Sequence, residues 1–258
     1  MDPVNNSLEN GLKPEMFVIN LSSRPKSEFR LFYHPVYLTR NMFHQYTTNY
    51  KRGDTIVKQQ AVFSGNHIKS LHVSVEQSLK NLRTSYIDIL YVHWWDYATS
   101  IEEVMNGLHN LVVQGKVLYL GISDTPAWIV SKANQYARDH GKTPFVIYQG
   151  LWNVMKRDFE RDIIPMVRAE GTSSLHNAHA ILAINPFNIG MSLAPWGVVG
   201  QGRFRTDEEE ERRRQTGEKG RTLIRSEWER NEDEKKVSKA LEEVAKQVGA
   251  KHITAGKS

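Results

Sequence analysis

The sequence Ile87-Asp-Ile-Leu-Tyr-Val-His93 decides the fold, and Trp94, Trp95 and Asp96 follow it directly. Its side chains are apolar and mostly β-branched or aromatic, which is typical of a strand buried on both faces, as in a parallel sheet. In α/β folds, ligands bind at the carboxyl ends of the strands. The imidazole at this end is therefore the first candidate for a functional group, with a hydrogen-bonded structural histidine as the alternative.

Helical and strand-like segments alternate along the rest of the chain. Apolar spacing predicts helices over 70–83, 100–114, 126–139, 158–169 and 232–248, and short apolar runs predict strands over 117–123, 145–149 and 191–196. A run at 16–19 is a further candidate strand. Repeated units of one strand followed by one helix predict parallel strands with helices outside, either a doubly wound sheet or a (β/α)8 barrel. No Gly-x-Gly-x-x-Gly motif follows any strand, so the fingerprint of the doubly wound dinucleotide fold is missing.

Several helix ends are also marked in the sequence. Ser100 and Glu103 have the spacing of a capping box, and Gly115 stands where a helix-ending glycine would. Pro126 opens a helix near its first turn, whereas Pro165 lies inside a predicted helix and indicates a kink.

Composition limits the classes of function. The 258 residues include no cysteine, which excludes disulfides, thiolate catalysis and Cys-based zinc sites; we expect no metal site. The net charge is +5, but the charges are mixed in sign along the chain, which favours a solvated surface over nucleic-acid binding. There is no signal peptide at the start and no segment apolar enough to span a bilayer, so we predict a cytoplasmic protein without membrane contact.

Five stretches carry a resemblance to a known family: 70–75, 86–96, 115–128, 148–153 and 193–196. They resemble the aldo-keto reductases, and most closely the fungal aryl-alcohol dehydrogenase branch, which includes norsolorinic acid reductase. The resemblance implies an α/β fold of the (β/α)8 TIM-barrel type that binds NADP(H) in extended form at the carboxyl ends of its strands. It also implies a small aromatic carbonyl or alcohol as substrate. The oligomeric state stays open.

The resemblance assigns roles to matching positions. His93 matches the catalytic histidine that orients the carbonyl, and a donor at that place stabilises the charge that develops there. The cofactor would contact the Ser123–Asp124 pair and Gln149 through its carboxamide, Trp152 through its nicotinamide ring, and a loop through its pyrophosphate. That loop comprises Ala194, Pro195, Trp196, Gly200, Gly202 and Arg203. Trp94 and Trp95 would form an aromatic wall for the substrate, with core packing as the alternative.

The sequence also departs from the family. Residues 1–66 contain no motif of the kind that carries the catalytic tyrosine and its aspartate, and Gln45 stands at the position of the catalytic lysine. The segment that binds the adenosine 2′-phosphate has no counterpart after residue 255. We therefore expect a barrel truncated at both ends, with open sheet edges that residues 1–45 would have to cover. Marginal stability and a tendency to aggregate follow from this.

We predict one domain over residues 1–258, with an irregular segment at 1–45, an atypical insertion at 172–190 and a charged loop at 206–232. Joining Gly171 to Met191 restores the family pattern, so 172–190 has the character of a retained intron, with a surface insertion as the alternative. The charge run at 206–221 indicates a solvated helix or loop. The function that the resemblance implies is an NADP-dependent oxidoreductase of aromatic aldehydes, ketones and alcohols, with a place in fungal secondary metabolism. The alternatives are an inactive remnant and a regulatory binding protein.

Overall fold

The computed structural model describes residues 16–19, 65–93, 95–170, 191–219, 227–250 and 252–253. The chain divides into two compact units, the first comprising Met1–Gly150 and Asp162–Ala194 and the second Leu151–Arg161 and Pro195–Ser258. The prediction of a single domain over the whole chain stays a prediction. The predicted insertion at 172–190 and, apart from residues 16–19, the predicted irregular segment at 1–45 lie outside the described residues.

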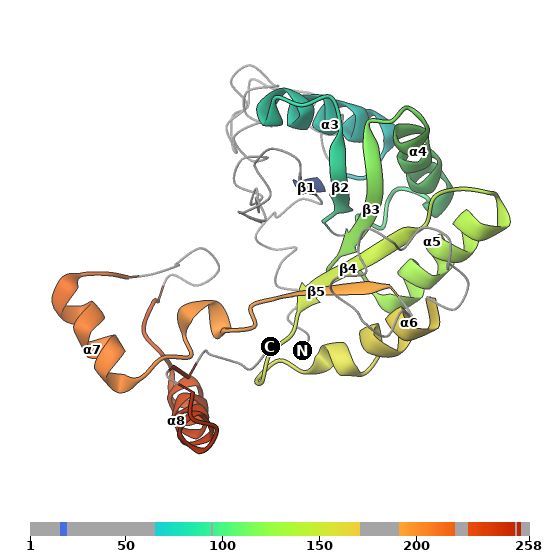
Figure 1. Cartoon of the computed structure of the whole chain (residues 1–258). Helices are drawn as coiled ribbons and strands as arrows, with labels where there is room; N and C mark the ends of the chain where they lie inside the picture. The colour runs from blue at the N-terminus through green and yellow to red at the C-terminus, as the bar shows by residue number, and fades with distance from the viewer. Residues whose placement is uncertain are drawn as a thin grey trace. The chain divides into compact units, whose positions relative to one another are not determined.

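A five-stranded sheet in the order β1-β2-β3-β4-β5 forms the core (Figure 1). The strands are β1 (Met16–Ile19), β2 (Ile87–Val92), β3 (Val117–Ser123), β4 (Phe145–Leu151) and β5 (Ser192–Trp196). β2, β3 and β4 are parallel, whereas β1 pairs with β2 in the antiparallel direction. The predicted α/β class is confirmed, and the candidate strand at 16–19 is confirmed as an edge strand.

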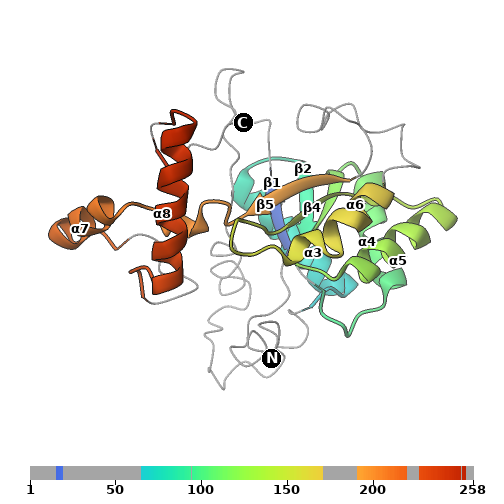
Figure 2. The ribbon, with the colours of Figure 1, turned by 90° about the horizontal axis from the view of Figure 1, so that it is seen from below.

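Helices α3 to α6 line one side of this sheet (Figures 1 and 2). They are α3 (Ile68–Leu82), α4 (Ile101–Val113), α5 (Ala127–Asp139) and α6 (Ile163–Glu170). Consecutive helices contact one another, as expected for connections between neighbouring parallel strands. The second unit contains the 3-10 helix η2 (Asp158–Glu160), the single turn η4 (Gly200–Gly202), α7 (Asp207–Thr216) and α8 (Glu232–Gln247).

The strand that decides the fold is buried as predicted. Ile87, Leu90, Tyr91 and Val92 are each exposed by 1% or less. The ring of Tyr91 lies over Gly121 of the neighbouring strand, where an added Cβ would be only 2.5 Å from the ring. A glycine at this position therefore allows β2 and β3 to pair beneath a large aromatic side chain.

Two predicted helix features need correction. The Ser100 hydroxyl accepts a hydrogen bond from the Glu103 amide at 3.1 Å, but the Glu103 carboxylate accepts from the Ile68 amide at 3.0 Å and so does not complete a capping box. Pro165 does not kink a long helix, because a 3-10 turn precedes it and α6 begins only at Ile163. Proline is tolerated in a first turn, where its missing N–H would have no partner within the helix.

Candidate functional site

The carboxyl ends of three parallel strands bring together predicted site residues of the first unit. Ser123, the last residue of β3, is in register with Gln149 of β4. His93 comes one residue after Val92, which is paired with Ile122, so it lies at the same edge of the sheet as Ser123. Ser123 and Gln149 are buried, and His93 is partly buried. This edge therefore combines an imidazole, a hydroxyl and an amide.

His93 is electrically neutral at neutral pH. Burial lowers the pKa of its ring from 6.5 to about 4. A neutral imidazole has one N–H donor and one acceptor nitrogen, so it can donate a hydrogen bond to an oxygen without carrying a charge. The strand β2 fixes its position, because the residues directly before it are locked in the sheet on both sides.

Asp124 places a carboxylate beside the buried hydroxyl of Ser123. The Ser123 Oγ lies 3.5 Å from Asp124 Oδ2, and the Asp124 amide donates to the Gln149 carbonyl at 3.0 Å. The carboxylate is exposed, and the backbone has φ +42°, in the left-handed region. A carboxylate here accepts hydrogen bonds but cannot donate them, unlike the asparagine that the family pattern has at this position.

Tyr148 and Thr125 form a buried hydrogen-bonded pair that the sequence did not reveal. The Tyr148 hydroxyl donates to the Thr125 carbonyl at 2.7 Å and accepts from the Thr125 amide at 3.1 Å. The Thr125 hydroxyl donates to the Ser123 carbonyl at 2.8 Å. Burial raises the pKa of Tyr148 well above its usual value, so the phenol stays protonated. The available signal was a tyrosine within a buried strand, because such a hydroxyl requires a partner.

The loop after His93 is held by Asp96. Its carboxylate accepts hydrogen bonds from the Asn66 amide at 2.7 Å and from the Thr99 amide and hydroxyl at 2.9 and 2.7 Å. Burial alone would raise the pKa of Asp96, but these hydrogen bonds lower it. Trp95 is 7% exposed, which favours the core-packing alternative, and its contact with substrate stays a prediction. Trp94 lies outside the described residues.

In the second unit, Trp152 is held between the end of β5 and η2. Its amide donates to the Trp196 carbonyl at 3.3 Å, and its indole N–H donates to Glu160 at 3.0 Å. The indole stacks on Phe159 with ring centroids 6.0 Å apart. The ring is therefore oriented from two sides and remains partly exposed. Its stacking against a nicotinamide ring stays a prediction.

The predicted phosphate-binding loop contains a concentration of left-handed backbone. Gly197, Gly200 and Gly202 have φ of +68°, +58° and +85°, which explains why glycine occupies these positions. A Cβ at Gly202 would meet no atom within 4 Å, so the backbone there is open to approach. Ala194 packs against the apolar core of the first unit, and Pro195 and Trp196 are partly buried. Contact of this loop with a pyrophosphate stays a prediction.

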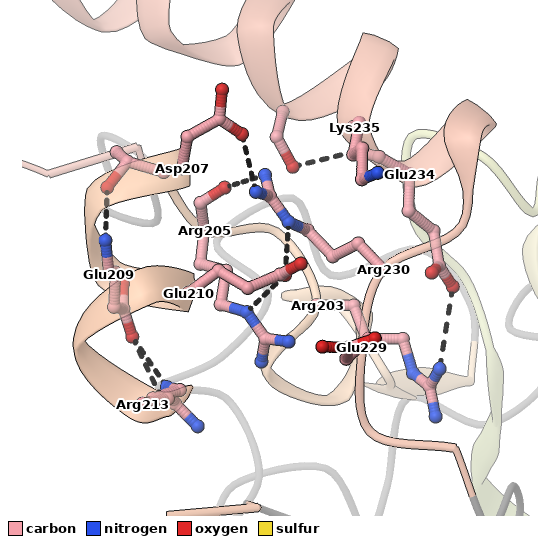
Figure 3. Close-up of polar contacts among 12 residues, drawn as sticks. Arg203, Arg205, Asp207, Glu209, Glu210, Arg213, Glu229, Arg230, Glu234 and Lys235 are labelled. Atoms are coloured by element: carbon pink, nitrogen blue, oxygen red, sulfur yellow. Dashed lines mark hydrogen bonds and ion pairs between the residues drawn. The ribbon is translucent and has the colours of Figure 1, made fainter. Parts of the chain in front are cut away.

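Arg203, at the end of this loop, is itself buried. Its guanidinium donates to the Glu227 carbonyl at 3.1 Å and lies 3.8 Å from the Glu234 carboxylate (Figure 3). The chain thus fixes the position of this cation and partly neutralises its charge. An anion bound here would share the guanidinium with Glu234.

A buried cluster of charges follows the loop: Arg205, Glu210 and Arg230 are 3%, 2% and 5% exposed (Figure 3). Glu210 Oε2 accepts from both arginines, at 3.0 and 2.6 Å, and Arg205 also donates to the Gly202 carbonyl at 3.1 Å. Burial would raise the pKa of Glu210, but the two arginines lower it. The prediction of a solvated charge run is therefore wrong at Glu210, because α7 turns this side chain inward to partners outside the run.

The described parts of the chain show two absences. No three His, Asp or Glu side chains lie close enough together there to hold a metal ion. None of the helices in these ranges has the length and apolar content to cross a membrane.

Comparison with known proteins identifies the family. The sequence profile of the Aldo/keto reductase family matches residues 51–255, and the chain therefore belongs to this family. The family assignment agrees with the parallel strands and outer helices of the first unit, and it confirms the aldo-keto reductase type of α/β fold that the sequence resemblance implied.

Individual relatives come from fungi. The chain is 58% identical to the aryl-alcohol dehydrogenase [NADP(+)] of Phanerodontia chrysosporium over 81% of its own length and 50% of the relative's. It is 57% identical to norsolorinic acid reductase B of Dothistroma septosporum over 64% of the chain and 37% of the relative. It is 49% identical to norsolorinic acid reductase B of Aspergillus parasiticus over 80% of the chain and 48% of the relative. The chain thus spans about half the length of such relatives or less.

Proposed function

We propose that this protein is an NADP(H)-dependent oxidoreductase that interconverts aromatic aldehydes or ketones and the corresponding alcohols. The observation that carries the proposal is the edge of the sheet at which His93 follows β2 and the buried Ser123 and Gln149 are paired in register. Family membership and the relative named for NADP(+) support it. Cytoplasmic localisation and a role in secondary metabolism stay predictions.

The residues fit a nicotinamide cofactor. A carboxamide has an N–H2 donor and a carbonyl acceptor, and the Ser123 hydroxyl, the Gln149 amide and the Asp124 carboxylate supply complementary groups. Within the second unit, the backbone at Gly202 is open to approach and the Arg203 guanidinium supplies a cation that a phosphate would share with Glu234. The amides of Gly200, Gly202 and Arg203 already donate to carbonyls of the same loop. When bound, the cofactor supplies or accepts the hydride.

His93 would act on the reacting carbonyl. Because burial keeps its imidazole neutral, the ring would donate one hydrogen bond to the carbonyl oxygen and stabilise the charge that develops there. We assign no residue of the described chain as the proton donor. The family's tyrosine and lysine have no match in residues 1–66, and this leaves a protein that binds cofactor without turnover as the alternative.

The test combines binding and turnover. Purified protein is titrated with NADPH while tryptophan fluorescence is followed, an aromatic aldehyde is then added, and oxidation of the cofactor is measured. Binding with turnover that His93→Ala abolishes would support the proposal. The matched control is His109→Ala, whose ring lies 3.0 Å from the hydroxyl of Thr143, just before the amino end of β4 rather than at the carboxyl ends of the strands. Binding without turnover would favour the alternative, and absence of binding would contradict both.

A further inference from the structure

Asp124 adopts a backbone conformation that non-glycine residues rarely have. Its φ is +42°, directly after the last residue of β3. Such a conformation is costly for a residue with a Cβ, although aspartate and asparagine tolerate it better than others. It persists only where the surroundings impose it, and such positions cluster at functional sites. The structure therefore must contain groups that hold Asp124 in place.

The residues on both sides of Asp124 are pinned by hydrogen bonds. The amide of Asp124 donates to the Gln149 carbonyl at 3.0 Å. Both backbone groups of Thr125 bond to one atom, the Tyr148 hydroxyl, at 3.1 Å for the amide and 2.7 Å for the carbonyl. Thr125 is 1% exposed and Tyr148 3%, so water cannot replace this phenol. One hydroxyl therefore fixes the peptide units on both sides of Thr125.

The two hydrogen bonds between Tyr148 and Thr125 exceed what is needed to satisfy a buried tyrosine hydroxyl. One acceptor would satisfy the phenol, yet the hydroxyl both donates to and accepts from the residue after the strained position. Its proton also stays in place, because burial raises the pKa of Tyr148. The donor and acceptor roles of the hydroxyl are therefore kept over the whole neutral range.

We propose that Tyr148 is a positioning residue that holds Asp124 in its left-handed conformation through the backbone of Thr125. The Asp124 carboxylate is thereby kept beside Ser123 at the edge where His93 lies. The effect on cofactor binding rests on the proposed function, whereas the restraint on the backbone does not.

The first test is Tyr148→Phe, which removes only the hydroxyl. Amide hydrogen exchange, resolved by residue, should become at least tenfold faster at Asp124 and Thr125, with the amides of Ile122 and Ile147 unchanged. The affinity for NADPH should fall several-fold. The matched control is Tyr136→Phe, which removes a hydroxyl that accepts from Asn106 at 3.2 Å on the helices, and it should change neither quantity. Unchanged exchange at Thr125 in Tyr148→Phe would overturn the proposal.

A second background separates restraint of Asp124 from a simple loss of two hydrogen bonds. Glycine adopts positive φ without strain, so in an Asp124→Gly background Tyr148→Phe should accelerate exchange at Thr125 much less than in the wild type. An equal acceleration in both backgrounds would overturn the proposal. If Tyr148→Phe does not fold, hydrogen exchange in Asp124→Gly decides: with the strain relieved, the bond from the Thr125 amide to the Tyr148 hydroxyl should open less often, so exchange at Thr125 should slow, and an unchanged or faster rate would refute the idea.

The two proposals fail in different ways. Should the wild-type protein not bind NADPH, the proposed function is wrong, but the exchange rates still decide whether Tyr148 restrains Asp124. Should the wild type bind NADPH while Tyr148→Phe leaves exchange unchanged, only the positioning role is wrong.

Discussion

Glu210 offers the strongest test of the energetics of the second unit. Glu210 is 2% exposed, and its Oε2 accepts from Arg205 and Arg230 at 3.0 and 2.6 Å (Figure 3). Its other oxygen, Oε1, accepts from Arg214 at 3.4 Å. Glu210→Gln keeps the size of the side chain and removes the charge, which leaves two buried guanidinium groups without their shared partner. Removing one member of a buried ion pair costs about 3–5 kcal/mol. Because Asp207 still lies 2.6 Å from Arg230, we expect the lower end, about 3 kcal/mol.

The neighbouring residue of the same helix supplies the control. Glu209 bonds to Arg213 at 2.8 Å, but its side chain is 37% exposed, so Glu209→Gln should cost only about 0.5 kcal/mol. Urea unfolding would be followed by tryptophan fluorescence, since the Trp228 ring lies 5.2 Å from the Arg205 guanidinium. With slopes of about 1–3 kcal/mol per molar urea, Glu210→Gln should lower the midpoint by at least about 1 M.

The comparison is decisive because both variants remove one charge from α7. Equal shifts of the two midpoints would refute the reasoning, since they would show that the buried cluster is worth no more than a surface pair. Faster residue-resolved amide hydrogen exchange in α7 than in α4 of the Glu210→Gln variant would locate the loss in the second unit.

Three further predictions follow from single contacts. Burial lowers the pKa of His93 from 6.5 to about 4, so the unfolded chain takes up a proton in this range that the folded chain does not. The free energy of unfolding should therefore be independent of His93 above pH 6.5 and fall by about 3 kcal/mol as the pH drops to 4. In urea titrations across that range, His93→Asn should abolish this fall. Gly121→Ala would place a Cβ 2.5 Å from the buried Tyr91 ring and should cost about 1–3 kcal/mol in thermal unfolding, whereas Gly107→Ala, in a helix, should cost less because it meets a flexible leucine end. Asp124→Asn should weaken binding of NADP+ relative to NADPH, because a carboxylate favours the cationic nicotinamide; an unchanged ratio of the two calorimetric affinities would contradict this.

Elements that depend on local chemistry were predictable from the sequence. The strand β2 follows from its apolar, β-branched run, and α4 begins after Ser100 and ends before Gly115 as its caps indicate. The Glu103 carboxylate was misassigned because its partner is the amide of Ile68, 35 residues earlier. Local spacing identifies a helix end, but it cannot tell which of two nearby helix ends a flexible carboxylate will cap.

The sequence predicts the candidate site only for residues whose position at the end of a strand determines where they lie in the fold. His93, Ser123 and Gln149 come to one edge because parallel strands end there, and the sequence contained that information. The contact between Tyr148 and Thr125 joins residues 23 apart, and its geometry depends on how two strands are registered. The burial of Glu210 likewise required Arg230, 20 residues further on, whereas the local charge density indicated solvent.

The antiparallel strand β1 connects the fold to the chemistry of His93. It pairs along Ile89–Val92, up to the residue before His93, and so occupies the edge of β2 that would otherwise expose unpaired backbone groups. The sequence predicts that residues 1–45 have to cover such an edge, and Met16–Ile19 does so for β2. Burial is the cause of the low pKa of His93, and a strand edge open to water would weaken that burial. We therefore expect that loss of the strand Met16–Ile19 would raise the pKa of His93 back toward its usual value.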